Sequence, residues 1–219
     1  MNRRPTKQHA WLAVLAVATL IVGLLRLMID RDPVNGELSM AWPEPSYATY
    51  RYTALLAGAL IGMSLSTSGV MLQSLLRNPL ASPFILGVSS GAGLGVMVML
   101  YVSRQTDIAL AWGKAPAAGV GALAALGIVY ALGQRRGLLD PLSLVLVGVV
   151  ISTIASAGIM FFQHLVKAGL LAEFTRWLMG HVPETLEDQA RWLLIIASAG
   201  GVVVGIVLGR AMDIASLGD

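Results

Sequence analysis

The chain has 219 residues, of which 56% are hydrophobic and only 12% charged, and it contains no cysteine. Soluble domains carry about 25% charged residues, so this composition indicates a polytopic membrane protein. The net charge of +3 comes from basic residues scattered between apolar runs, which argues against a nucleic-acid-binding surface, and the lack of cysteine excludes disulfides, thiolate chemistry and cysteine metal sites.

The first apolar run, from Trp11 to Leu25, follows the basic residues Arg3, Arg4 and Lys7. A positive segment before an apolar run is also the pattern of a signal peptide. This run is long for a signal peptide, however, and the charged segment 26–32 follows it in place of a small-residue cleavage site. We therefore expect a retained first membrane span.

Six apolar runs are long enough to cross about 30 Å of hydrocarbon as helices. The runs are continuous rather than alternating, which favours helices over strands, since each membrane span must satisfy its own backbone. The sequence thus predicts an all-α polytopic membrane protein with one transmembrane domain over residues 1–219. The expected spans are approximately 11–29, 53–76, 83–102, 115–133, 141–166 and 190–209.

The segments between the spans suggest an orientation. Basic residues are dense in the short segments that share a side with the N-terminus, including Arg77, Arg135 and Arg136. Because positive residues favour the cytoplasmic side, the N-terminus is expected to be cytoplasmic. On the outer side, residues 169–179 have helical apolar spacing but are too few to span, which predicts an interfacial helix anchored by Trp177.

The motifs of catalysis are missing from the sequence. Residues 87–95 are rich in glycine but lack the GK[ST] ending of a phosphate-binding loop, and no HExxH motif occurs. The three histidines, His9, His164 and His181, are far apart. We therefore expect no enzyme activity, no catalytic residue, no metal site and no cofactor.

The centres of the spans contain no Asp, Glu, Lys or Arg. Ionisable residues inside the membrane are typical of proton or ion coupling, so their absence argues against a secondary transporter. Hydroxyl and amide side chains do occur, and they either bond to helix carbonyls or line a polar translocation path. These residues are Ser64, Ser66, Thr67, Ser68, Gln73, Ser89, Ser90, Ser152, Thr153 and Ser156.

Small residues recur at four-residue intervals on both sides of a short basic turn. One series before the turn and one after it place small side chains along one helix face, which lets membrane helices approach closely. The turn is Arg77-Asn78-Pro79. The two series are Gly58, Gly62 and Ser66, and Gly87, Gly91 and Gly95.

The run SGVMLQSLLRNPLASPFILGVSSGAGLG, residues 68–95, closely resembles the signature of the iron-siderophore, haem and cobalamin permeases, the membrane subunits of type II ABC importers. Three further segments resemble the same family. They are LSLVLVGVVIST at 142–153, FTRWLMGHVPETLEDQ at 174–189 and MDIASLGD at 212–219.

This resemblance implies a ten-span fold in the inner membrane, of which the chain carries about the first six spans. It also implies partners. These are an ABC ATPase that supplies the energy, a periplasmic or lipoprotein substrate-binding protein, and a second copy of the permease or a paralogous permease. The chain ends within the region that resembles the ATPase-coupling segment, so we expect it to be incomplete relative to the family. The alternative to a transport subunit is a truncated, non-transporting remnant or scaffold.

The resemblance also assigns roles to particular residues. Arg51 matches the first of two arginines that dock the binding protein, whereas Ala54 stands in place of the second; the other interpretation of Arg51 is an arginine that reaches toward the membrane interface. The cytoplasmic gate would lie at Asp140, Pro141, Leu142 and Ser143. Contact with the ATPase would begin at Asp213, Ser216, Leu217, Gly218 and Asp219.

Overall fold

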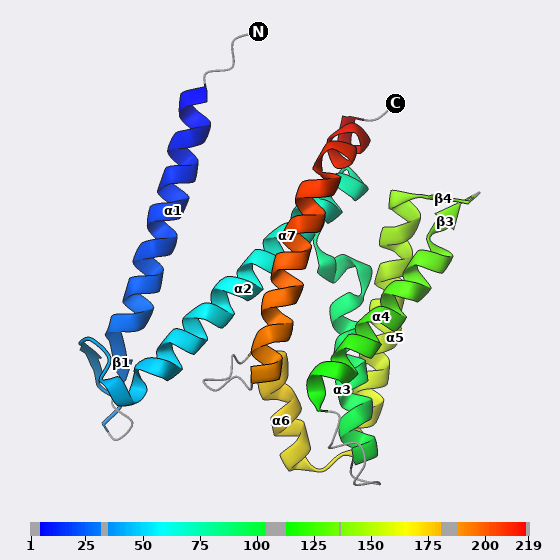
Figure 1. Cartoon of the computed structure of the whole chain (residues 1–219). Helices are drawn as coiled ribbons and strands as arrows, with labels where there is room; N and C mark the ends of the chain where they lie inside the picture. Colours follow the sequence, from blue (N-terminus) through cyan, green and yellow to red (C-terminus); the bar gives the residue numbers. More distant parts are fainter. Residues whose placement is uncertain (1–4, 32–34, 104–112, 136, 181–187, 218–219) are drawn as a thin grey trace. The chain divides into compact units, whose positions relative to one another are not determined.

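The computed structural model describes residues 5–31, 35–103, 113–135, 137–180 and 188–217, and most of these residues are helical (Figure 1). The chain divides into two compact units. The first comprises residues 1–63 and 182–198, and the second comprises residues 64–181 and 199–219. Two long helices, α2 (Pro45–Leu76) and α7 (Asp188–Leu217), contribute residues to both units.

The first unit contains α1 (Pro5–Met28), a short antiparallel hairpin and the amino-terminal parts of α2 and α7. The hairpin pairs β1 (Ile29–Arg31) with β2 (Leu38–Met40), in the register Ile29 to Met40. The sequence predicted no strand there, because three-residue strands carry too few side chains to show an alternating pattern.

Buried side chains join α1, α2 and α7 within this unit. The Arg51 guanidinium is buried and donates a hydrogen bond of 2.7 Å from Nη1 to the Leu27 carbonyl oxygen. The Ser198 hydroxyl, fully buried, lies 3.0 Å from the Leu60 carbonyl oxygen and 2.7 Å from that of Leu194. Ala57 is buried on the same side of α2 as Leu60, one helical turn away.

The second unit is a helical bundle. It contains the end of α2, the 3₁₀ helix η1 (Pro83–Leu86), α3 (Val88–Ser103), α4 (Lys114–Leu132), α5 (Pro141–Leu165), α6 (Ala168–Leu178) and the end of α7. A second hairpin, β3 (Gln134–Arg135) with β4 (Leu138–Leu139), joins α4 to α5. One apolar cluster lies between η1, the end of α2 and the start of α5, around Leu76, Leu86 and Leu144.

The expected third span, residues 83–102, is interrupted in the structure. Gly87 has a φ of 73° and separates the 3₁₀ turn of η1 from α3. A left-handed φ is costly for any residue with a Cβ atom, so glycine suits this break. Helix α5 packs directly on this break. The approach at Gly148 is so close that a Cβ atom there would overlap the Ile85 carbonyl oxygen.

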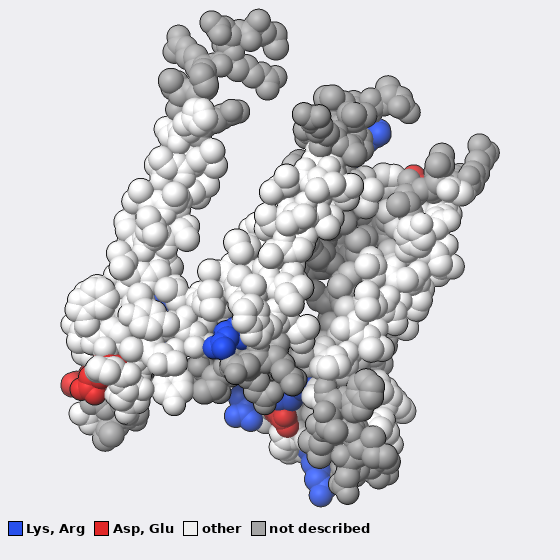
Figure 2. Space-filling model, in the orientation of Figure 1, with Lys and Arg blue, Asp and Glu red and all other residues white. Residues whose placement is uncertain are grey.

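Within the described residues, five helices are long and apolar enough to span a membrane. They confirm five of the six expected spans, and α3, with 16 residues, is the shorter sixth. Charged side chains gather near the helix ends, whereas the visible middle of each helix is uncharged (Figure 2). The five long spans are His9–Met28, Pro45–Leu76, Lys114–Leu132, Pro141–Leu165 and Ala190–Gly209.

Candidate functional site

Helices α3 and α4 approach each other through glycine. Built Cβ atoms at Gly95 and Gly121 would overlap the carbonyl oxygens of Ala117 and Gly91, respectively. One at Gly91 would lie 2.5 Å from the Cβ atom of Ala125. The glycine series in α3 therefore faces a matching small-residue face on α4, as close helix packing in a membrane requires.

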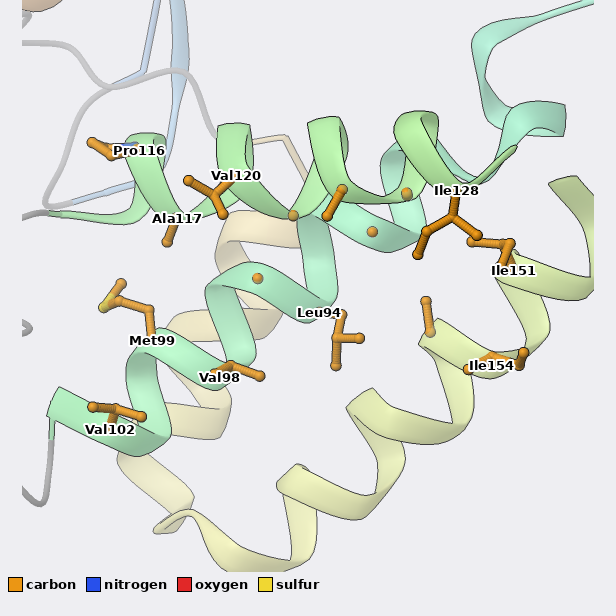
Figure 3. A pocket seen from close by; sticks show the side chains of 16 residues that line it. Leu94, Val98, Met99, Val102, Pro116, Ala117, Val120, Ile128, Ile151 and Ile154 are labelled. Carbon is orange, nitrogen blue, oxygen red and sulfur yellow. The ribbon is translucent and has the colours of Figure 1, made fainter. Parts of the chain in front are cut away.

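Beside this contact, α3, α4 and α5 enclose an apolar groove of about 550 Å³ (Figure 3). Leu94 and Val98 of α3, Val120 and Ile128 of α4, and Ile154 of α5 line it. The lining carries no hydroxyl, amide or charged side chain. Such a surface offers no hydrogen bond to a polar cargo, so this groove is not the candidate path.

A second hollow, of about 360 Å³, lies between the end of α2 and the end of α7. Three hydroxyl side chains of α2, Ser66, Thr67 and Ser74, line it. Opposite them, Gly205 and Gly209 of α7 leave the space open. A built Cβ atom at Gly205 would lie 3.0 Å from Thr67 Cγ2, so the two helices touch at that level. This hollow combines polar side chains with free volume, and it is the candidate functional site.

Several other hydroxyls point back to their own helix. The Ser68 hydroxyl donates to the Leu65 carbonyl at 3.1 Å, that of Ser90 to Gly87 at 3.1 Å, and that of Thr153 to Val149 at 2.9 Å. Hydrogen bonds of this kind satisfy a hydroxyl within an apolar environment. Of the polar residues that the sequence singled out, Ser66 and Thr67 line the hollow, whereas Ser68, Ser90 and Thr153 are not among its lining residues. Ser74, which lines it too, was not singled out.

The glycine series in α2 has a different environment from the one in α3. A Cβ atom at Gly58 or Gly62 would meet no atom within 4 Å, whereas Ser66 lines the hollow. Gln73 is half-buried, and its backbone carbonyl accepts a hydrogen bond from the Asn78 N–H at 3.1 Å, where α2 ends.

Helix α2 ends in a Schellman motif built on Arg77. Arg77 has a φ of 49°, and its backbone N–H bonds to Ser74 while that of Asn78 bonds to the Gln73 carbonyl. This position is usually glycine, and a side chain there is uncommon. The Asn78 side chain then accepts from the Leu80 N–H at 2.9 Å, across Pro79. The Arg77-Asn78-Pro79 sequence therefore fixes a tight turn at the surface.

The residues that the family resemblance marked as a gate form the start of α5. Asp140 is the N-cap, and its carboxylate accepts from the Ser143 backbone N–H at 2.9 Å and from the Ser143 hydroxyl at 2.5 Å. Pro141 occupies the first helical turn, where its missing N–H costs nothing. Leu142 is exposed. The geometry accounts for these residues as a helix cap, and their role as a gate stays a prediction.

Arg51, the expected docking residue, is 8% exposed because its guanidinium caps the last turn of α1. A cation at the end of a helix interacts favourably with the helix dipole and with unpaired carbonyls. This contact ties α1 to α2 within the first unit, and docking of a binding protein by Arg51 stays a prediction.

The expected interfacial helix, 169–179, is α6 (Ala168–Leu178). Phe174 is fully buried against Val96, Met97 and Leu100 of α3. Trp177 stacks on Phe174, with ring centroids 6.3 Å apart. The Trp177 ring is half-buried, with one face on Phe174, and its role as a membrane anchor stays a prediction.

The predicted ATPase-coupling residues lie at the end of the chain. Asp213, Ser216 and Leu217 belong to the last turns of α7. Gly218 and Asp219 lie outside the described residues. Among the residues that the structure describes, no group of three or more His, Cys, Asp or Glu side chains could hold a metal ion.

The family model of the FecCD transport family matches residues 12–219. The chain belongs to this family. The match includes α1 from residue 12 onward, the later helices that the structure describes, and the candidate hollow between α2 and α7.

The FecCD chain is similar to curated transport proteins of several organisms. It is 35% identical over 176 residues to the cobalamin import system permease protein BtuC of Halobacterium salinarum, covering 78% of this chain and 45% of that protein. It is 35% identical over 195 residues to the achromobactin transport system permease protein CbrC of Dickeya dadantii, covering 86% and 55%. It is 29% identical over 217 residues to the hemin transport system permease protein HmuU of Yersinia pestis, covering 95% and 61%.

A solved structure shares the fold. The inward-facing conformation of a metal-chelate type ABC transporter matches with a TM-score of 0.73 at 22% identity, over 94% of this chain and 62% of that chain. The FecCD chain thus spans between 45% and 62% of the length of these relatives.

Sequence reasoning missed two contacts of this FecCD chain. Lys114, at the start of α4, forms an ion pair of 2.5 Å with Glu173 of α6. Ser198 binds the Leu60 carbonyl across 138 positions of sequence. Neither residue belongs to a local motif, and a serine in an apolar run gives no sign of which helix it meets.

Proposed function

We propose that the chain is a transmembrane permease subunit of an ABC importer for an iron-siderophore, haem or cobalamin. The match of the FecCD family model to residues 12–219 carries this proposal. The uncharged middles of the spans support it, because a transporter without intramembrane ionisable groups needs energy from a partner. Translocation would proceed by alternating access, driven by nucleotide binding in a separate ATPase.

The partners follow from the same proposal. An ABC ATPase binds at the cytoplasmic end of α7, from Asp213 to Asp219, and a periplasmic or lipoprotein binding protein delivers the substrate on the outer side. A second copy of the chain, or a paralogous permease, completes the path in the inner membrane. The N-terminus is cytoplasmic in this arrangement, so the Arg77 turn and Asp140 face the ATPase.

Within the chain, we assign the α2–α7 hollow to the translocation surface. Thr67 and Ser66 supply hydroxyl groups there, and Gly205 leaves room beside them. Weak, scattered hydrogen-bonding groups suit passage, because strong binding would retain the cargo. The apolar α3–α5 groove has no such group.

Reconstitution tests the proposal. The full chain is placed in proteoliposomes with the ATPase and the binding protein of the same genome, and uptake of labelled ferric siderophore, haem and cobalamin is measured with and without ATP. ATP-dependent uptake of one substrate is the expected result. If the ATPase binds but none of the three substrates enters, the chain acts as a scaffold and the transport proposal is wrong.

Two neighbouring hydroxyls give a matched test of the path. Thr67→Val removes a hydroxyl that lines the hollow while keeping the side-chain shape, and Ser68→Ala removes one that bonds to its own helix. Uptake should fall in the first variant and stay unchanged in the second. Equal uptake by both variants would contradict the assignment of the hollow.

A further inference from the structure

Aromatic side chains are concentrated where α1 ends and α2 begins. Four of the ten Trp and Tyr residues of the chain (five of each) lie between positions 42 and 52. Their exposed fractions are 65% for Trp42, 59% for Tyr47, 42% for Tyr50 and 51% for Tyr52. With the exposed Leu38 and Met40 of β2, these residues form what we call the α1–α2 aromatic surface.

Two hydrogen bonds set this surface at the level of the last turn of α1. Arg51, between Tyr50 and Tyr52, donates to the Leu27 carbonyl at 2.7 Å. The Ala41 N–H, next to Trp42, donates to the Met28 carbonyl at 3.0 Å. The surface therefore lies where the α1 span ends.

The length of α2 also indicates that its first turns lie at the edge of the membrane. Its 32 residues extend about 48 Å at 1.5 Å per residue. The hydrocarbon of a bilayer is about 30 Å thick, and about 40–45 Å with the headgroups. Because the apolar run of α2 begins at residue 53, the first two turns of the helix, which carry three tyrosines, extend into the headgroup layer.

The chemistry of the surface suits that layer. Trp and Tyr combine an apolar ring with a polar tip and are enriched at membrane interfaces. The exposed Leu38 and Met40 gain from contact with acyl chains, whereas the exposed carboxylates of Glu37 and Glu44 belong in water. These two acidic side chains also disfavour anionic headgroups, so the surface fits a zwitterionic phospholipid.

We propose that the α1–α2 aromatic surface is an interfacial anchor, with the phospholipid headgroup layer as its partner. It fixes the depth of α1 and of the amino end of α2 in the bilayer. Trp177, the aromatic residue whose sequence context suggested an anchor, is half-buried and packs on Phe174, so it serves as the comparison. The proposal requires only that α1 and α2 span a bilayer, and it stands apart from the substrate and the ATPase.

Tryptophan fluorescence tests the anchor. In two variants of the full chain, four of the five tryptophans are replaced by phenylalanine, which leaves only Trp42 or only Trp177. Both are reconstituted in phosphatidylcholine vesicles with lipids brominated near the headgroup or near the bilayer centre. Headgroup-proximal bromine should quench Trp42 about twofold, and central bromine much less, because interfacial rings lie at headgroup depth. Trp177 should be quenched less than Trp42.

A second measurement, spin labelling, changes only one residue of the chain at a time. Since the chain has no cysteine, a spin label can be attached at Trp42→Cys or, as the control, at Glu37→Cys without background labelling. The label at position 42 should be more accessible to oxygen, which concentrates in lipid, than to a water-soluble nickel chelate, and the label at position 37 should show the reverse. Equal nickel access at both positions, or Trp42 emission insensitive to both brominated lipids, would overturn the anchor and indicate a surface that faces water or another protein.

Discussion

The two glycine series of this chain share a four-residue spacing but not an environment. In α3, Gly91 and Gly95 lie against the backbone of α4 so closely that a Cβ atom would overlap it. In α2, a Cβ atom at Gly58 or Gly62 would meet nothing within 4 Å. The same pattern of sequence thus produces a tight helix contact in one helix and an uncovered face in the other.

The difference lies in the partner helix. Gly121 on α4 is itself small, so the two backbones can meet, and each glycine is useful only because the other is there. In α2, the buried side is formed by Ala57 and Leu60, and Ser198 of α7 meets that side. A small-residue spacing therefore indicates that a close approach is sterically allowed, while the facing residues determine whether it occurs.

The largest effect is expected at the α3–α4 contact. Gly121→Val would place a branched side chain against the Gly91 carbonyl oxygen, which a well-packed interface accommodates only by separating the helices. We expect the free energy of unfolding to fall by about 3 kcal/mol or more. Thermal unfolding in detergent micelles, followed by circular dichroism, measures the loss. An unchanged unfolding temperature would show that α3 and α4 are not in backbone contact.

Two neighbouring residues of α2 sharpen the comparison. Ala57→Leu adds three carbon atoms to a side chain that is 1% exposed, whereas Gly58→Leu adds its side chain to open space. The first change should destabilise the chain by about 1–3 kcal/mol, as overpacking does, and the second should have little effect on the same unfolding curve. If Gly58→Leu leaves the stability intact but abolishes assembly with a second copy, the glycine series of α2 is a surface for that partner.

A third prediction concerns the Ser198 hydroxyl of α7, which meets the buried side of α2 at Leu60. Ser198→Ala removes its hydrogen bonds to the Leu60 and Leu194 carbonyls. A loss of about 1 kcal/mol is expected, the usual value for one hydrogen bond between helices. Ser68→Ala, which loses a bond within its own helix, is the control. Equal losses in the two variants would mean that the bond between α7 and α2 adds nothing.

The smallest expected effect has the opposite sign. Gly58→Ala replaces a glycine in a helix interior that has free space around its Cα atom. Alanine favours the helix by about 0.5–1 kcal/mol relative to glycine, so the unfolding temperature should rise slightly. The same substitution at Gly91 should lower it, because the new Cβ atom would lie 2.5 Å from that of Ala125. A fall at both positions would remove the distinction between the two series.

Much of the fold could be predicted from the apolar runs alone, because the length and composition of a run are enough to identify a membrane span. The start of α2 and the break at Gly87 show where the prediction was limited. The expected span began at 53, whereas α2 begins at Pro45, since the two extra turns carry tyrosines that a hydropathy pattern counts weakly. For the interruption at Gly87, the sequence offered a signal in the glycine that follows Pro83. The prediction relied on the four-residue spacing of small residues and placed Gly87 inside a helix.

The roles of individual polar residues were harder to predict. Arg51 was expected at a docking rim or at the membrane interface, and its contact with Leu27 depends on how α1 and α2 meet. Asp140 and Ser143 carry a recognisable N-cap pattern before an apolar run, which local chemistry could have identified. Thr67 and Ser68 are adjacent and chemically alike, and only the position of α7 distinguishes the one that lines the hollow.

The short α3 has a consequence for the bilayer itself. Its 16 residues reach about 24 Å, less than the hydrocarbon thickness of about 30 Å, so α3 needs backbone beyond its own ends, such as the turn at Gly87, to complete a span. Lipid acyl chains cannot form hydrogen bonds with the N–H and C=O groups of such a backbone, so protein must shield it. Gly148 lets α5 close over it at backbone distance. A methyl group at position 148 would overlap the Ile85 carbonyl oxygen and push α5 away from this turn, so this glycine keeps α5 close enough to cover it.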